Sequence, residues 1–100
     1  MYRATTPTHI FTLPFETDLL KTIQITYKQF DKIILQKTGG DCTLTNNAIK
    51  LELTQEETLL FAPTAWVQIQ LRVVTKEGKV MASKIEKKWP KECLDEEVLE

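Results

Sequence analysis

Histidine and cysteine are the residue types in this chain best suited to acid–base or nucleophilic catalysis. The chain has one histidine, His9, and two cysteines, Cys42 and Cys93, which lie far apart in the sequence. His9 has no obvious nucleophile near it, and a surface or edge histidine accounts for it without any chemistry. Cys42 follows an acid after a Gly-Gly turn, as a thiol in a loop does. A dyad of His9 with either cysteine is the catalytic alternative.

The acids and glycines are also poorly arranged for a metal or cofactor site. No C-x-x-C pair occurs, and a zinc site normally needs four ligands. Glu56 and Glu57 are adjacent and would diverge on a helical turn. DEEVLE (95–100) lacks the glycine of a calcium loop, and KTGGD (37–41) has no following helix to form a phosphate cradle. We therefore predict no enzyme, no metal and no cofactor.

Composition and charge limit the classes of partner. The 100 residues suit a single domain, and 42% of them are hydrophobic. Thirteen basic and 14 acidic residues give a formal net charge of −1, so no overall field attracts nucleic acid or a membrane surface. The lysines of SKIEKKWPKE (83–92) are interrupted by acids, which favours a solvated edge strand and tail over a nucleic-acid site.

The compartment is inferred from the first residues and the cysteines. MYRATTPTHIF (1–11) shows no secretory signal, and no apolar run approaches the roughly 20 residues that span a bilayer. We expect a soluble protein made in the cytoplasm, unless an assembly carries it out. Cys42 and Cys93 are expected as two reduced thiols, with a disulfide between them as the alternative.

Alternating apolar and polar residues predict about seven short strands. The clearest lie in TDLLKTIQITYKQF (17–30), where apolar residues alternate from Ile23 to Tyr27, and in WVQIQLRVVT (66–75), where they alternate from Val67 to Val73. Turn signals recur about every 8 to 12 residues, and no helix is long enough for the crossover of a parallel sheet. The chain is therefore predicted to be all-β, an immunoglobulin-like sandwich of about seven antiparallel strands.

Three turns are predicted between the strands. LTQEETLLF (53–61) reads as one short helical turn near residues 54–60, because Thr54 and Glu57 have the spacing of a reciprocal N-terminal cap. This turn would join the fifth strand to the sixth, with Leu59, Leu60 or Phe61 plugging the core. Gly39-Gly40 signals a turn with positive φ, and Gly78 lies in a hairpin turn.

The sandwich domain is expected to cover residues 1–88, followed by an acidic tail or short helix at 89–100. Leu94, Val98 and Leu99 would form an apolar stripe on such a helix, which could dock on this domain or on a partner.

Aromatic residues are the strongest candidates for contact with a partner. Trp66 starts the most clearly patterned predicted strand, on the face opposite its apolar residues, and Trp89 follows the last strand. Core packing and an interface are both open for each. Protein interfaces are enriched in Trp, Tyr and Arg, so we predict partner-binding residues at Tyr2, Trp66, Arg72 and Trp89.

Three segments of the chain together resemble short proteins of phage and prophage tail modules of Firmicutes. They are TTPTHIFTLPFETDLLKTIQITYKQ, NAIKLELTQEETLLF and VQIQLRVVTKEGKVMASKI. The resemblance spans roughly residues 3–87 and is carried by TLPF, LTQEET and the QLR strand with its glycine hairpin and AS. Similar domains are thought to form the N-terminus of baseplate upper proteins. The resemblance implies a structural or assembly role with no catalytic residues, while WPKECLDEEVLE (89–100) departs from the pattern.

The leading hypothesis is thus a non-enzymatic assembly protein of a phage tail or baseplate, which binds other tail proteins or forms a homo-oligomer. It would be cytoplasmic when made and part of the virion tail once assembled. The alternative is a carbohydrate-binding module that stacks sugar on Trp66 or Trp89, which would need coplanar exposed aromatics. It ranks well below the leading hypothesis, because three of the eight aromatic residues, Phe11, Phe15 and Tyr27, are expected in the core. An enzyme ranks third.

Overall fold

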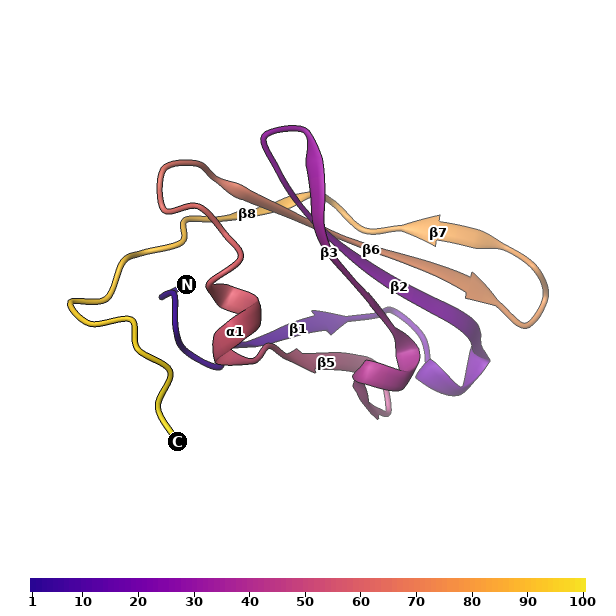
Figure 1. Cartoon of the computed structure of the whole chain (residues 1–100). Coiled ribbons are helices and arrows are strands. Elements are labelled where there is room, and N and C mark those ends of the chain that lie inside the picture. The colour runs from indigo at the N-terminus through magenta and orange to yellow at the C-terminus, as the bar shows by residue number, and fades with distance from the viewer.

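The computed structural model describes residues 1–100 and shows two antiparallel sheets in a sandwich-like arrangement (Figure 1). The all-β prediction is confirmed. The smaller sheet has three strands, in the order β1 (Thr8–Thr12), β5 (Ala48–Glu52) and β4 (Thr43–Thr45). The larger sheet has the order β3 (Lys32–Thr38), β2 (Leu20–Gln29), β6 (Val67–Thr75) and β7 (Val80–Ala82), and β8 (Glu86–Lys88) also pairs with β6.

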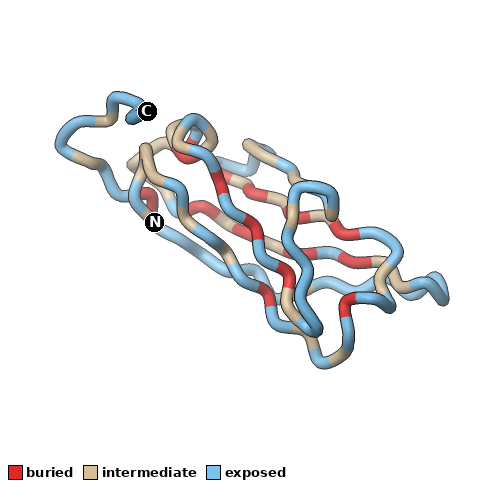
Figure 2. The backbone as a smooth tube through the Cα atoms, turned by 90° about the horizontal axis from the view of Figure 1, so that it is seen from below, coloured by how far each residue is buried: buried red, intermediate tan, exposed pale blue.

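The core lies between the two sheets and follows the alternation of the sequence. Burial recurs at every second residue of the central strands β2, β5 and β6, as the red segments of Figure 2 show. The opposite faces of these strands are more exposed to solvent, which is the pattern of antiparallel sheets with one buried face. Twelve apolar residues form the buried cluster: Phe11, Ile23, Ile25, Tyr27, Ile49, Leu51, Leu53, Phe61, Val67, Ile69, Leu71 and Val73.

The structure has eight strands because the last predicted strand is interrupted at Ser83. The Ser83 hydroxyl accepts a hydrogen bond from the Leu71 N–H at 3.0 Å, and the Ser83 N–H donates to the Leu71 carbonyl at 2.8 Å. A side-chain oxygen thus replaces a backbone carbonyl in the ladder. This splits the return chain into β7 and β8, and all six of their residues are exposed.

The helical turn between the sheets is confirmed. α1 (Gln55–Thr58) connects β5 of the small sheet to β6 of the large sheet (Figure 1). The Thr54 hydroxyl accepts from the Glu57 N–H at 3.1 Å, and the Glu57 carboxylate accepts from the Thr54 N–H at 2.9 Å. Of the proposed plugs, Phe61 is fully buried whereas Leu60 is 55% exposed.

The prediction of positive φ at Gly39-Gly40 is wrong. These residues form a 3-10 turn, η2 (Gly39–Asp41), and the positive φ angles lie elsewhere. Gly78 has a φ of 92° in the β6–β7 hairpin. The two-residue β2–β3 hairpin turn has Phe30 at 53° and Asp31 at 61°. Two consecutive left-handed residues give the turn a twist that matches the flanking strands, but Phe is an unusual choice for it.

Residues 89–100 contain no helix, so the predicted apolar stripe does not form. Leu94, Val98 and Leu99 are all exposed. The segment nonetheless lies beside the N-terminal residues and α1, at the same end of the sandwich (Figures 1 and 2).

Candidate functional site

Trp66 and Trp89 lie together at the end of the sandwich that carries α1. Trp66 directly precedes β6 and Trp89 directly follows β8, and the antiparallel pairing of Val67 with Lys88 brings them side by side. Their ring centroids are 5.2 Å apart at an interplanar angle of 76°, an edge-to-face contact. Trp66 is 53% exposed and Trp89 37%. Neither tryptophan is a core residue, and together they form one aromatic surface, here called the tryptophan pair.

A buried amide holds the loop that leads into Trp66. Gln29, at the end of β2, is 2% exposed. Its Nε2 donates to the carbonyls of Ala62 and Ala65 at 2.7 and 2.9 Å, and its Oε1 accepts from the Ala62 N–H at 2.8 Å. A side chain that satisfies three backbone groups of one loop fixes that loop in a single conformation. Trp66 is therefore presented from a rigid support.

The N-terminal residues extend this surface. Residues 1–3 run beside Lys91, with backbone hydrogen bonds from Arg3 N to the Lys91 carbonyl at 2.8 Å and from Lys91 N to the Met1 carbonyl at 2.7 Å. Tyr2 forms a parallel bridge with Lys91, whose ammonium lies 5.3 Å from the tyrosine ring centroid. The Met1 ammonium donates to the Trp89 carbonyl at 3.2 Å. Tyr2, 53% exposed, thus lies next to the tryptophan pair, beside the sequence-distant strand end formed by Trp89 and Lys91.

Arg72 is not part of this arrangement. It is exposed in the middle of β6, between Gln24 of β2 and Ala82 of β7. Six residues of extended strand, roughly 20 Å, separate it from Trp66. The structure therefore brings together three of the four predicted partner-binding residues.

His9 joins the two sheets rather than lying free at a surface. Its Nδ1 is 2.7 Å from the hydroxyl of Tyr27, which is fully buried on β2. Burial, together with the charges of Lys88 and the N-terminal ammonium, lowers the pKa of His9 to about 4. Burial also raises the pKa of Tyr27. The neutral imidazole and the protonated Tyr27 hydroxyl therefore share a structural hydrogen bond that occupies this ring nitrogen.

The cysteines and acids form no reactive constellation. Cys42 and Cys93 are both free, and burial and the charge of Asp41 raise the pKa of the Cys42 thiol. The Cys93 thiol donates to the Arg3 carbonyl at 3.1 Å. Three or more metal-ligating side chains do not converge anywhere in the chain. None of its helices has the length and apolar character needed to cross a membrane.

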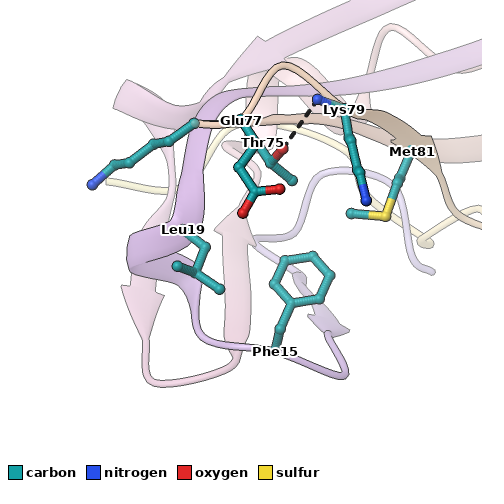
Figure 3. A pocket seen from close by; sticks show the side chains of 7 residues that line it. Phe15, Leu19, Thr75, Glu77, Lys79 and Met81 are labelled. Carbon is teal, nitrogen blue, oxygen red and sulfur yellow. Dashed lines mark hydrogen bonds between the residues drawn. The ribbon is translucent and has the colours of Figure 1, made fainter.

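A cavity of about 420 Å³ opens at the opposite end, beside the β6–β7 hairpin (Figure 3). Phe15, Leu19 and Met81 form its apolar walls, and hairpin residues from Thr75 to Lys79 form its rim. The Lys79 N–H donates to the Thr75 hydroxyl at 3.1 Å and stabilises that rim. Its volume is in the range of ligand pockets, but its three charged side chains lie at an open mouth rather than converging.

Sequence patterns did not reveal this cavity, and the expectation that Phe15 belongs to the core is wrong. Phe15 follows Pro14 in an irregular segment before η1 (Thr17–Leu19), so it sits half-buried where the sheets diverge. Pro14, which ends the hydrogen-bond ladder of β1, was the sequence signal that could have placed Phe15 outside the core.

Comparisons with family models, curated proteins and solved structures give no match for this chain. No residue role is therefore transferred from a relative, and the tryptophan pair stands as the candidate site on its geometry alone.

Proposed function

We propose that this chain is a non-enzymatic assembly protein that binds another protein through the tryptophan pair and Tyr2. The observation that carries the proposal is the contact of Trp66 with Trp89. Two large aromatic side chains pack against each other and still stay substantially exposed to solvent. Aromatic anchors of this kind dominate the binding energy of protein interfaces.

The support beneath the tryptophan pair favours a binding role. The Gln29 amide fixes the loop before Trp66, and the β6–β8 pairing fixes the chain before Trp89. An anchor that is already ordered in the free protein loses little conformational entropy on binding.

The sequence resemblance supplies the setting, a phage or prophage tail or baseplate. In that setting the chain would be made in the cytoplasm and would act as a subunit or adaptor in the tail. The partner would be a neighbouring tail protein or another copy of this chain.

A carbohydrate-binding role is less well supported. Sugar rings stack flat on aromatic faces, and a platform of two residues needs the faces to be nearly coplanar. The rings of Trp66 and Trp89 are inclined at 76°, so one presents its edge to the other. The two rings therefore do not form one flat platform for a sugar.

The test is co-expression with tail proteins encoded next to this chain, followed by co-purification. Trp66→Ala with Trp89→Ala should abolish the complex while the urea midpoint changes little. The matched control is Phe30→Asn, which removes a 63% exposed aromatic of the β2–β3 hairpin, outside the tryptophan pair, and suits its positive φ. Equal binding by the double variant and the wild type would refute the proposal, and glycan binding that is lost in the double variant would favour the carbohydrate module.

A further inference from the structure

The C-terminal residues 92–100 are held against the rest of the chain by polar contacts. Arg3 Nη1 donates to Glu96 Oε1 at 2.5 Å. Gln55 Nε2 donates to the Leu99 carbonyl at 2.7 Å, and Gln55 Oε1 accepts from the Leu99 N–H at 2.8 Å. Leu94 is fully exposed and Leu99 is 77% exposed. With so little apolar burial, the segment belongs to the part of the structure that opens most easily.

The surface that holds the segment is built independently of it. Gln55 begins α1, which is fixed by the Thr54–Glu57 cap. Arg3 Nη2 donates to the Leu59 carbonyl at 3.3 Å. The backbone that carries Gln55 and one guanidinium nitrogen of Arg3 are therefore held by groups outside the segment. The two side chains together fit a carboxylate that lies three residues before a main-chain N–H and C=O.

The guanidinium of Arg3 makes an empty site unfavourable. Its side chain is only 16% exposed, and its Nε is buried without a hydrogen-bond partner. Loss of Glu96 would leave this guanidinium without its carboxylate partner. The free surface therefore favours another acidic segment with the same spacing.

We propose that the surface formed by Arg3, Gln55 and the Leu59 carbonyl binds residues 92–100 of a second copy, so that two copies exchange these segments. In the structure this surface binds residues 92–100 of its own chain. A second copy has the same residues, so its segment would make the same contacts. Exchange of identical elements is a low-cost route to dimers. The stretch 92–95 provides the hinge, because Lys91 stays fixed to Met1 and Arg3 while exchange breaks the contact of the half-buried Cys93 with the Arg3 carbonyl.

Exchange depends on concentration, since the intramolecular contact has the advantage of its short tether in dilute solution. Crowding of copies in an assembly would reverse that balance. This inference does not rest on the tryptophan pair, so it can hold or fail separately from the proposed function.

The test uses complementary charge reversal. Arg3→Glu places two acids opposite each other within one chain, and Glu96→Arg places two arginines opposite each other, so each variant repels its own segment. In a mixture of the two variants, exchange brings the substituted position 3 of one chain against the substituted position 96 of the other, so an acid meets an arginine. At the second site of the dimer, the native Arg3 of one chain meets the native Glu96 of the other. We expect each variant alone to have the monomer mass of 11.6 kDa and the equimolar mixture to show twice that mass by light scattering.

The double variant Arg3→Glu with Glu96→Arg restores the pair within one chain and shows that both substitutions are compatible with folding. A mixture that stays monomeric at every concentration up to the solubility limit would overturn the proposal. If Arg3→Glu fails to fold, cross-linking replaces the charge-reversal test. One chain carries Glu56→Cys and a second chain carries Glu97→Cys, and both also carry Cys42→Ser and Cys93→Ser so that each has a single cysteine. The two chains are mixed and treated with a short bismaleimide. A covalent heterodimer supports exchange, and its absence overturns it.

Discussion

The two ends of the sandwich fill the space between the sheets in different ways. At the end that carries α1, here called the closed end, Phe61 and Tyr27 are fully buried with ring centroids 5.8 Å apart. At the end that carries the β6–β7 hairpin, here called the open end, Phe15 and Leu19 leave a cavity of about 420 Å³. The tryptophan pair lies at the closed end, so its exposed rings adjoin a filled core.

The closed end also gathers the polar contacts between distant parts of the chain. Gln29 holds the loop before Trp66, His9 bonds to Tyr27 across the sheets, and Arg3 meets Glu96. At the open end the Thr17 hydroxyl donates to the Thr45 carbonyl and the Asn47 amide to the Leu13 carbonyl, but neither bond involves a buried amide or joins the two sheets. We therefore expect substitutions at the closed end to cost more stability than matched substitutions at the open end.

The largest difference is expected from two phenylalanines. Phe61→Ala should lower the free energy of unfolding by about 3–5 kcal/mol, because it empties a fully enclosed site. Phe15→Ala should cost about 1 kcal/mol, since that ring is half-buried beside a cavity already open to water. Urea denaturation measures both, and equal losses would remove the distinction between the ends.

Gln29→Leu should cost about 2–4 kcal/mol. The substitution leaves the Ala62 N–H and the carbonyls of Ala62 and Ala65 without their partner inside the protein. The tryptophan emission should also shift, because the loop before Trp66 loses its support. Gln36→Leu is the matched control at an exposed strand position and should stay within about 0.5 kcal/mol. A Gln29 variant as stable as that control would show that the loop is held by other contacts.

Acid should weaken the closed end through His9. Its pKa is about 4 in the folded protein and 6.5 in the unfolded chain, so between these values only the unfolded chain takes up the proton. Stability contributed by the His9–Tyr27 bond is complete above pH 6.5 and is lost as the pH falls towards 4. The slope is bounded by about 1.4 kcal/mol per pH unit, and partial exposure of the ring reduces it.

The comparison of wild type with His9→Gln isolates this effect, since the acids titrate equally in both. The difference in urea midpoint between the two proteins should shrink from pH 7 to pH 4.5. A constant difference over that range would mean that the histidine does not titrate as its burial requires.

The smallest effect is expected at the helical cap. Thr54→Ala removes the hydroxyl that accepts the Glu57 N–H and should cost about 1 kcal/mol. The Glu57 carboxylate keeps its ion pair with Lys37 in this variant. Thr64→Ala, an exposed threonine at the same end, should be neutral by thermal denaturation. If both variants melt together, the cap does not stabilise the corner.

The alternation of apolar residues and the spacing of the helix cap were sufficient to predict most elements of the closed end. The spacing of Thr54 and Glu57 predicted the corner, and alternation along β2 and β6 predicted the buried faces, because these signals depend on neighbours within a few residues. Contacts between distant residues were out of reach. Nothing in the local sequence links Gln29 to Ala62, or His9 to Tyr27.

The partner-binding residues divide in the same way. Trp66 and Trp89 could be named as candidate contact residues from the sequence, with core packing left open for each. Their contact with each other depends on the register of β6 against β8, which alternation does not fix. Arg72 was chosen by residue type alone and lies apart. The 3-10 turn at Gly39-Gly40 and the half-buried Phe15 were mistaken because glycine and aromatic residues each serve more than one environment.

Hydrogen exchange with mass spectrometry would locate the contact surface itself, by comparing the free chain with its co-purified tail-protein complex. We expect added protection at residues 1–3, 64–68 and 87–91, around the tryptophan pair, with unchanged exchange in the hairpin at 75–81. Protection confined to that hairpin and to Phe15–Leu19 would contradict the proposed function, because the open end would then be the contact surface.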